Sequence, residues 1–543
     1  MKYFKKILIV FISSALLASC ADLDSLPEGG IITSKQNQEV IEAIPERIEA
    51  EVNGMFSCIA QQFFIFGSIQ SRDDDCGYPA VCLSQDLNGA DMVGDNSGYN
   101  WFSVALNYSD RQDTYANPFM RFAVFYYQMK TANDILSSIP EDAEDAQLLV
   151  YRAQAKAVRA FDYLCLAPCY QFKYKGHEDA PGVPIVTNDA QIDFSNNPRA
   201  PLRDVYELII KDLTEAIDGL AGYNRSSKAE IDQKVAYGLR ARANLYMENW
   251  SEAASDAAKA LEGYTPYSRT EVSVPTFISA SDHSWMWALL IAPANLTDPY
   301  PSWPSVLGSF SGDAYTTAVG CYKSINRLLF DLIPATDVRK GWWVDANLHS
   351  DNLATVTWNG VSGDDVAKLS ITDVKLPFVP YTNVKFGQYG GPGSTVNAGD
   401  WCIMRAEEMI LIQAEATAMA GNEAAGRQIL ENFVKTNRDP AYAVPSNRSF
   451  QDEVWFQRRV ELWGEGFAMT DIMRLGKNVV RFKNGIDTNY PDAFKFNIAA
   501  NDGWLLMRFP QQETNNNMGI VNNSDGTMPV SGQGAGLTDG VTD

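Results

Sequence analysis

Six charged side chains lie at helix-like spacing around residue 460. In the stretch RRVELWGEGFAMTDIMRLGK, residues 458–477, they are Arg458, Arg459, Glu461, Glu465, Asp471 and Arg474. Glu461 and Glu465 are four residues apart and would share one face of a helix, and two carboxyl groups facing a cleft are the minimum equipment of a glycosidase. The alternative is an ionic clamp between helices. We favour the clamp, because Arg458 and Glu461, like Asp471 and Arg474, have the i,i+3 spacing of helical ion pairs.

A second set of polar side chains lies in DDDCGYPAVCLSQDLNGADMVGDNSGYNWF, residues 73–102. Asp86 and Asn88 are followed by Ala90, where a calcium-binding loop would need a third oxygen ligand. We therefore predict no cofactor and no metal site. A structural calcium ion held by another set of carboxylates is the one alternative left open.

The same stretch contains the residue types that bind sugars. Asp91, Asn96 and Asn100 can form hydrogen bonds with sugar hydroxyls, and the rings of Tyr99 and Trp101 can stack on the apolar face of a pyranose. We predict that these five residues bind ligand. The alternative for Trp101 is that it seals the helical core together with its neighbour Phe102.

A proline-rich loop, NLTDPYPSWPSVLGSFSGDAY (residues 295–315), adds aromatic candidates. Exposed aromatic side chains in such a loop are hard to justify without a ligand, so we predict Tyr300, Trp303 and Tyr315 as ligand-binding residues. Trp101, Tyr300 and Trp303 form the predicted stacking set. Trp285 and Trp287 instead alternate with Met286 in a strand-like run, and we interpret them as core residues.

The elements that must position these side chains are mainly helical. Apolar stripes within residues 235–261 and again within 403–434 each predict two helices joined by a short turn, with small alanines that let the second helix lie close to the first. This pattern predicts a mainly α fold, an α-α superhelix of tetratricopeptide-like helix hairpins. Between the hairpins, residues 270–400 lose helical periodicity and contain short strand-like runs, which predicts a loop-rich, minor-β ligand-binding region.

The amino-terminal residues predict export and lipid attachment. A basic start with Lys2, Lys5 and Lys6, a short apolar run and the sequence Leu17-Ala18-Ser19-Cys20 look like a bacterial lipoprotein signal with its lipobox. Acyl chains on Cys20 would hold the protein to a membrane. We therefore predict a signal peptide over 1–19, a lipid tether and lead-in over 20–45, and a lipid-anchored protein. Asp22 and Asp24 resemble the acidic signal that sends some lipoproteins to the outer cell surface, so we expect the protein to face the cell exterior.

The remaining boundaries follow from composition. We predict a single domain over 46–520, with a helical scaffold at 46–269 and 401–480 around the loop-rich region 270–400. The polar, glycine-rich end, 521–543, is predicted to be a flexible tail. The formal net charge of −23 repels phosphate backbones, so nucleic acid is not expected as a partner.

Seven cysteines follow Cys20, and they lack the spacing of zinc ligands. We interpret most of them as buried apolar groups. A disulfide between Cys76 and Cys82 is kept as an alternative.

Several motifs, in order along most of the chain, resemble the SusD/RagB family of outer-membrane nutrient-binding lipoproteins. They are the lipobox, KAVRAFDYLCLAPCYQF, GVPIV, the 236–261 hairpin, IMRAEEMILIQAEA, RRVELWGEGF and RFPQQETNNN. The resemblance implies four tetratricopeptide-like hairpins, a loop-rich ligand surface, and a role as lid on a SusC-like TonB-dependent transporter. Ala468 and Met473 stand where family members commonly have basic residues.

The resemblance also implies a binding protein and not an enzyme. We accordingly expect a surface lipoprotein that captures oligosaccharide on an aromatic platform and delivers it to the transporter for nutrient uptake. The alternatives are a peptide- or glycopeptide-binding member of the same scaffold and, further removed, a surface glycosidase or a purely structural helical-repeat scaffold.

Overall fold

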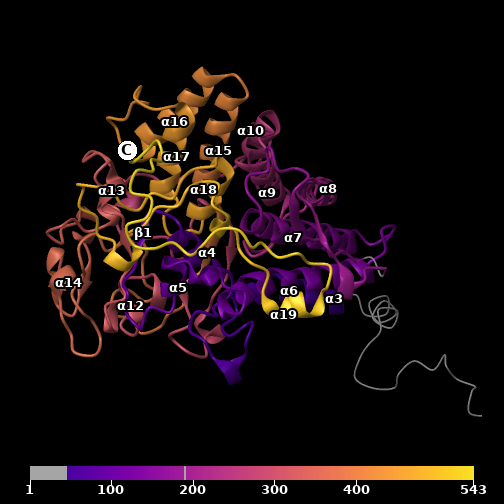
Figure 1. The fold of residues 1–543 in the computed structure, drawn as a ribbon, viewed down its shortest axis with the longest axis horizontal. Helices are drawn as coiled ribbons and strands as arrows, with labels where there is room; N and C mark the ends of the chain where they lie inside the picture. The colour runs from indigo at the N-terminus through magenta and orange to yellow at the C-terminus, as the bar shows by residue number, and fades with distance from the viewer. Residues whose placement is uncertain (1–45, 189–190) are drawn as a thin grey trace, which may run out of the picture. The chain divides into compact units, whose positions relative to one another are not determined.

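Helices provide most of the regular structure, as the apolar stripes predict. A computed structural model describes residues 46–188 and 191–543. The predicted signal peptide 1–19, the lipid attachment site Cys20 and the tether 20–45 lie outside these residues. Within the described chain the strands have only two to five residues (Figure 1). The predicted mainly α class is confirmed.

The helices are α3 (Glu46–Ser57), α4 (Tyr78–Asn88), α5 (Ser103–Leu106), α6 (Ala116–Ser138), α7 (Ala146–Tyr170), α8 (Leu202–Gly219), α9 (Gln233–Tyr246), α10 (Trp250–Ala260), α11 (Trp303–Val306), α12 (Tyr315–Ala318), α13 (Arg327–Phe330), α14 (Asp364–Lys368), α15 (Ala406–Met419), α16 (Glu423–Asn437), α17 (Phe450–Glu461), α18 (Ala468–Leu475) and α19 (Gln511–Asn516). The strands are β1 (Met92–Val93), β2 (Pro181–Pro184), β3 (Arg199–Pro201), β4 (Trp285–Leu289), β5 (Ser324–Ile325), β6 (Thr357–Trp358), β7 (Val361–Ser362) and β8 (Trp401–Arg405).

The long helices pack in the order of the chain. Helix α6 contacts α7, α7 contacts α8, α8 contacts α9 and α9 contacts α10. The next member of this series is α15, which packs against both α10 and α16 (Figure 1). The loop-rich region is therefore an insertion between two consecutive helices of the superhelix. The residues Ile48–Asp543 cluster into one compact unit.

Small side chains bring the paired helices together. In α10 the predicted stripe of Ala253, Ala257 and Ala260 is fully buried. In the second hairpin a β-carbon placed on Gly426 would lie only 2.6 Å from the carbonyl oxygen of Ala414, so α15 and α16 touch through their backbones. Both predicted hairpins are present, as α9 with α10 and as α15 with α16.

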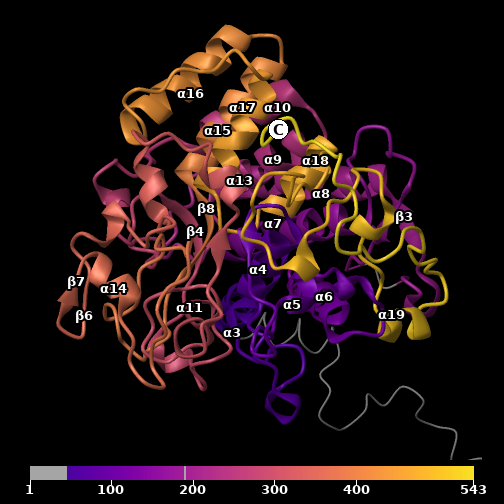
Figure 2. The ribbon, with the colours of Figure 1, turned by 60° about the vertical axis from the view of Figure 1, so that its left-hand side comes forward.

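The inserted region begins and ends at one antiparallel strand pair. Leu289 of β4 pairs with Trp401 of β8, and β8 runs directly into α15. Trp285 and Trp287 on β4 are each 1% exposed, so their interpretation as core residues is confirmed. Figure 2 shows the region with α11, α14, β6 and β7 beside the helical stack. The strand pair thus holds the two ends of a long, irregular segment at the scaffold.

A single buried arginine, Arg481, binds backbone oxygens at the ends of helices α4 and α5. The fully buried Arg481 donates to the backbone oxygens of Gly89 at 3.0 Å, Leu106 at 2.5 Å and Leu87 at 2.7 Å. The last carbonyl groups of a helix have no partner within the helix. Arg481 provides a hydrogen-bond partner for such carbonyls at the end of α4. It is 392 residues away from Gly89 in the sequence.

The segment 521–543 is not the free polar tail that its composition predicts. Asp539 is 3% exposed and accepts a hydrogen bond from Arg459 at 2.8 Å, and Asn523 donates to the backbone oxygen of Tyr170 at 3.0 Å. Figure 1 shows this yellow segment running back across the scaffold. The prediction is wrong because polar residues and glycines can satisfy the polar groups of distant segments, which composition does not reveal.

Two further findings concern the cysteines and the membrane. All seven cysteines of the described residues are free, so the alternative of a Cys76–Cys82 disulfide is wrong. Within the same residues, no helix combines the length and the apolar character that a membrane crossing requires.

One buried carboxyl group in the scaffold predicts an unusual pH dependence of stability. Asp162 on α7 is 0% exposed, and neither of its carboxyl oxygens has a hydrogen-bond partner among the described residues. Burial raises the pKa of Asp162 well above its ordinary value, so the folded protein keeps this carboxyl protonated to a higher pH than the unfolded chain does.

Replacing this carboxyl by an amide, Asp162→Asn, should remove its contribution to the pH dependence. Asp162 stabilises the fold fully below its unfolded pKa of about 4, and this contribution falls by up to about 1.4 kcal/mol per pH unit as the pH rises toward the raised folded pKa. Urea unfolding across this range should therefore show the variant gaining stability relative to the parent protein as pH rises. The control for loss of one charge is Asp179→Asn, at a side chain that is 82% exposed. Parallel profiles for parent and Asp162→Asn would contradict the assignment.

Candidate functional site

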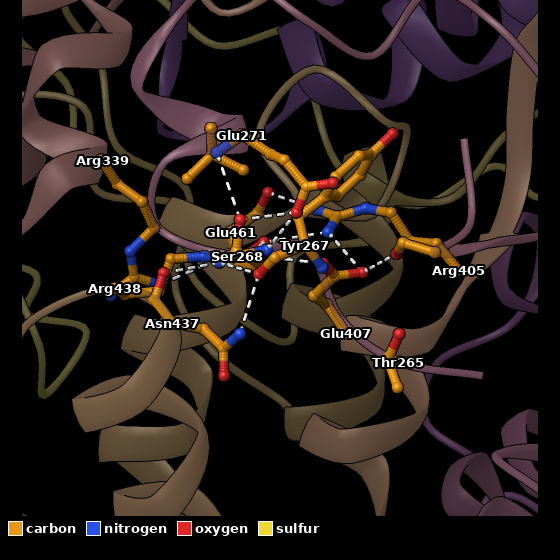
Figure 3. A network of polar contacts seen from close by, with 12 residues as sticks. Thr265, Tyr267, Ser268, Glu271, Arg339, Arg405, Glu407, Asn437, Arg438 and Glu461 are labelled. Carbon is orange, nitrogen blue, oxygen red and sulfur yellow. Dashed lines mark hydrogen bonds and ion pairs between the residues drawn. The ribbon is translucent and has the colours of Figure 1, made fainter. Parts of the chain in front are cut away.

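The charged cluster around residue 460 is a buried network of ion pairs (Figure 3). Glu461, at the end of α17, is 0% exposed. Its carboxylate accepts hydrogen bonds from Arg405 at 2.8 Å, from two nitrogens of Arg438 at 2.8 Å each, and from Arg339 at 3.3 Å. Three guanidinium groups therefore surround one carboxylate.

The neighbouring Glu465 is held in the same way. Its carboxylate accepts hydrogen bonds from Arg405 at 2.8 Å and from Lys385 at 2.6 Å. Lys385 also donates to the backbone oxygens of Glu461 and Trp463, at 2.9 and 2.8 Å. Lys385 belongs to the loop-rich region, so this lysine attaches that region to the end of α17.

The electrostatics of this network argue against acid catalysis. Burial by itself would raise the pKa of Glu461, but Arg438 and Arg405 outweigh it and hold that pKa well below the ordinary value. Arg405 and Lys385 likewise overcome burial and lower the pKa of Glu465. A glycosidase acid needs a raised pKa in order to donate a proton near neutral pH. The geometry is that of an ionic clamp, the interpretation favoured from the sequence.

The position of Ala468, where a basic residue is common, is explained by close packing. A β-carbon on Gly89 would lie 2.8 Å from the β-carbon of Ala468, so α18 approaches the end of α4 closely. Asp86 accepts hydrogen bonds from the backbone N–H groups of Gly466 at 3.0 Å and Ala468 at 3.1 Å. Burial raises the pKa of Asp86 to about 7.

Asp86 thus orients the start of α18. Within the described residues no group of three or more His, Cys, Asp or Glu side chains is placed to hold a metal ion. In that part of the chain, no cluster of carboxylates supports the alternative of a structural calcium ion.

Three of the predicted ligand-binding residues are buried. Asp91, 4% exposed, forms a two-pronged ion pair with Arg459 at 2.6 and 2.9 Å. Asn100 is 3% exposed and donates to the backbone oxygen of Asp95 at 2.8 Å. The polar groups of both buried side chains already bind other parts of the protein, so their prediction as sugar-binding residues is wrong for this structure.

Trp303, the third buried residue, was expected in the stacking set. It is 3% exposed, and its indole N–H donates to the backbone oxygen of Gly399 at 2.8 Å. Its ring meets those of Phe386 and Trp401 edge-on, each with centroids 5.7 Å apart. This prediction is wrong because Trp303 packs inward against Phe386 and against Trp401 at the start of strand β8.

The structure brings three of the other four predicted aromatic residues together. The rings of Tyr300 and Tyr315 lie with centroids 5.1 Å apart, and the Trp101 side chain reaches the Tyr315 hydroxyl. All three side chains are partly exposed. We call Trp101, Tyr300 and Tyr315 the aromatic platform. Of the remaining candidates, Tyr99 is 60% exposed and Asn96 is exposed, both within the segment that leads to Trp101.

Carboxylates hold the two tyrosines of the platform. The Tyr315 hydroxyl donates to Asp73 at 2.5 Å, and the Tyr300 hydroxyl donates to Asp313 at 2.9 Å. Burial is the main reason why the pKa of Tyr315 is raised to about 12, and the hydrogen bond to Asp73 contributes. The hydroxyl ends of both rings are therefore held in place, and both residues remain partly exposed.

Contacts between distant segments place the platform. The Gln62 side chain donates to the backbone oxygens of Asp298 at 2.6 Å and Pro301 at 3.1 Å, which ties the loop before Arg72 to the loop of Tyr300. Strand β1 pairs with β5, and this brings the segment of Trp101 beside the segment that follows Tyr315.

Sequence reasoning missed the supporting residues of the platform. Asp73 could have been suspected from its place in the acidic run DDD at 73–75, whereas nothing in the sequence distinguishes Gln62 or Asp313. Asp73 and Gln62 become recognisable only when segments more than 200 residues apart meet, as Asp73 and Tyr315 do across 242 residues.

A separate hollow lies elsewhere in the loop-rich region. It has a volume of about 600 Å³, and its lining includes Arg269, Lys340, Trp343 and His349. None of the residues predicted from the sequence lines it. It is a second place in which a ligand could be accommodated, which a binding experiment must distinguish from the platform.

Comparison with known proteins gives a consistent result. Residues 80–245 match the family described as "Starch-binding associating with outer membrane", and residues 338–526 match the family described as "SusD family". SusD-like protein P38 of Formosa agariphila is 21% identical over 517 residues, which cover 88% of this chain and 93% of that protein.

Solved structures share the fold. A SusD-like carbohydrate binding protein from Bacteroides vulgatus superimposes with a TM-score of 0.70 at 23% identity, over 88% of this chain and 97% of the other. A laminarin binding SusD-like protein superimposes with a TM-score of 0.60 at 16% identity, over 88% of this chain and 98% of the other.

The ionic clamp makes a prediction about stability. Glu461→Gln should lower the free energy of unfolding by on the order of 3–5 kcal/mol, because it leaves three buried guanidinium groups without their shared carboxylate. Because the folded pKa of Glu461 is lowered, its contribution is present above its unfolded pKa of about 4.3 and is lost as the pH falls through the folded value.

Urea unfolding at neutral pH measures this effect. The matched control is Glu423→Gln, which breaks the exposed i,i+4 pair with Arg427 and should cost only about 0.2–0.5 kcal/mol. Equal, small losses in the two variants would contradict the clamp.

Proposed function

Because the chain belongs to the SusD family, we propose that it is a surface lipoprotein that captures oligosaccharide on the aromatic platform. In this proposal it delivers the oligosaccharide to a SusC-like TonB-dependent transporter in the outer membrane. The lipobox at Cys20 supports a lipid anchor in that membrane, with the binding surface facing the cell exterior.

The observation that carries the proposal is the meeting of three partly exposed aromatic rings from distant segments. Trp101 lies more than 190 residues before Tyr300 and Tyr315, yet its side chain reaches the Tyr315 hydroxyl. Flat aromatic faces give a sugar ring a large contact area and lose little conformational freedom on binding. The platform therefore has the features that a pyranose requires.

The polar rim of the platform suits a sugar as well. The carboxylates of Asp73 and Asp313 each accept one tyrosine hydroxyl and keep further lone pairs for sugar hydroxyls. The hydroxyls are already oriented by these bonds, so binding would immobilise few additional groups. Two structural relatives, a carbohydrate binding protein and a laminarin binding protein, agree with this class of ligand.

The rival proposals rest on less. A peptide- or glycopeptide-binding role uses the same scaffold and is decided by the ligand panel below. A glycosidase role for Glu461 and Glu465 would need a carboxyl group that can donate a proton near neutral pH. In both residues the neighbouring cationic side chains outweigh burial and lower the pKa of the carboxyl group, which makes it a poor proton donor.

Loss of an aromatic face should weaken binding. We expect Trp101→Ala and Tyr300→Ala to weaken the affinity for the best ligand of a glycan panel by at least about tenfold, or about 1.4 kcal/mol. Isothermal titration of the full-length protein in detergent measures this, with unchanged thermal unfolding as evidence that each variant folds. A parallel panel of peptides tests the rival ligand class.

Two controls locate the site. Phe194→Ala removes an aromatic ring that is 64% exposed and outside the platform, and Arg269→Ala changes the separate hollow. Both should retain the affinity of the parent protein. Loss of binding in Arg269→Ala with full binding in Trp101→Ala would move the site to the hollow.

A further inference from the structure

The polar groups around the aromatic platform are predominantly acidic. Asp73 accepts the Tyr315 hydroxyl, Asp313 accepts the Tyr300 hydroxyl, and Asp298 accepts the backbone N–H of Tyr300 at 2.9 Å. Each of these carboxylates lies next to a ring that a ligand would touch. Among the described residues the ion pairs of the structure include none of the three.

The arginine that lies over Trp101 does not offset this charge. Arg72 lies over the Trp101 ring, with its guanidinium carbon 5.6 Å from the ring centroid. Two of its nitrogens bond the two carboxylate oxygens of Asp74 at 2.9 Å each. Its charge is therefore matched by Asp74, and its guanidinium lies over one face of the indole of the partly exposed Trp101.

The carboxylates influence one another. The pKa of Asp73 is raised, mainly by partial burial and further by the negative charges of Asp298 and Asp74. A ligand that brought another negative charge to the rings would meet the same repulsion. The net charge of −23 on the whole chain adds a long-range field of the same sign.

We infer that the aromatic platform selects uncharged or amino-bearing oligosaccharides and rejects those that carry carboxylate or sulfate groups. This inference rests on the proposed function, since it names the class of ligand for the same site. The apolar faces of the rings provide contact area for any pyranose. The surrounding carboxylates then discriminate between sugars by charge, through like-charge repulsion against acidic ones.

Asp73 is the residue with the greatest influence on this selection. Its carboxylate bonds the hydroxyl of Tyr315, which in turn is within reach of Trp101 and packs against Tyr300. Asp73→Asn removes the charge and keeps an amide oxygen that can accept the Tyr315 hydroxyl. Any change in selectivity then reports the charge, because the position of the ring is retained.

A glycan array that contains neutral, amino-bearing, uronate-containing and sulfated oligosaccharides tests the inference with the full-length protein. We expect the neutral and amino-bearing glycans to bind and the acidic ones to bind at least about tenfold more weakly at equal length. Binding confined to acidic glycans would overturn the inference and leave the proposed function standing. Binding to no glycan, with binding to peptides, would overturn both.

The variant and the salt concentration separate charge from shape. For a neutral oligosaccharide and its C6-oxidised counterpart, Asp73→Asn should reduce the difference in affinity several-fold, and Asp179→Asn, an exposed carboxylate far along the chain, should leave it unchanged. Raising the salt concentration should also reduce the difference in the parent protein, because exposed charges are screened. A difference that neither Asp73→Asn nor salt alters would mean rejection by shape and would overturn the inference.

Discussion

A buried negative charge must have a partner, and the carboxylate of Glu461 meets this requirement with three arginines at once. Arg339 comes from the loop-rich region, Arg405 from the end of β8, and Arg438 from the residue after α16. Removal from water makes each of these charges costly unless all are in place. Four segments are therefore fixed relative to one another by one side chain, and Lys385, bonded to Glu465, adds a further link to the inserted region.

This constraint is what allows an irregular region to hold a precise surface. The loop-rich segment has few hydrogen-bonded strands, and its strand pairs are only two to five residues long. Its rigidity comes from polar side chains that reach backbone groups, as Gln62 does at Asp298 and as the Trp303 indole does at Gly399. On this base the Tyr300 and Tyr315 hydroxyls are held by carboxylates, so the rings are oriented before a ligand arrives.

Local patterns in the sequence predicted what local interactions determine. The hairpins of α9 with α10 and of α15 with α16 follow from apolar and alanine stripes, and the core position of Trp285 and Trp287 follows from alternation. Trp101, Tyr300 and Tyr315 were each predicted as ligand-binding residues from residue type, but the predicted stacking set had Trp303 in place of Tyr315. Trp303 was mispredicted because its partners Phe386 and Trp401 arrive from about 80 to 100 residues later. Asp91 was mispredicted because Arg459 lies 368 residues away.

The hydrogen bonds that Arg481 donates to the ends of α4 and α5 have a consequence for the order in which the chain can fold. The carbonyl groups of Leu87, Gly89 and Leu106 are made early in synthesis and receive their partner only when residue 481 has followed. Long loops must close before such contacts can form, and proteins dominated by them fold slowly. The end of α4 stays without this partner until residue 481, in the last eighth of the chain, is present. An incomplete chain is therefore prone to aggregation until that late segment is present.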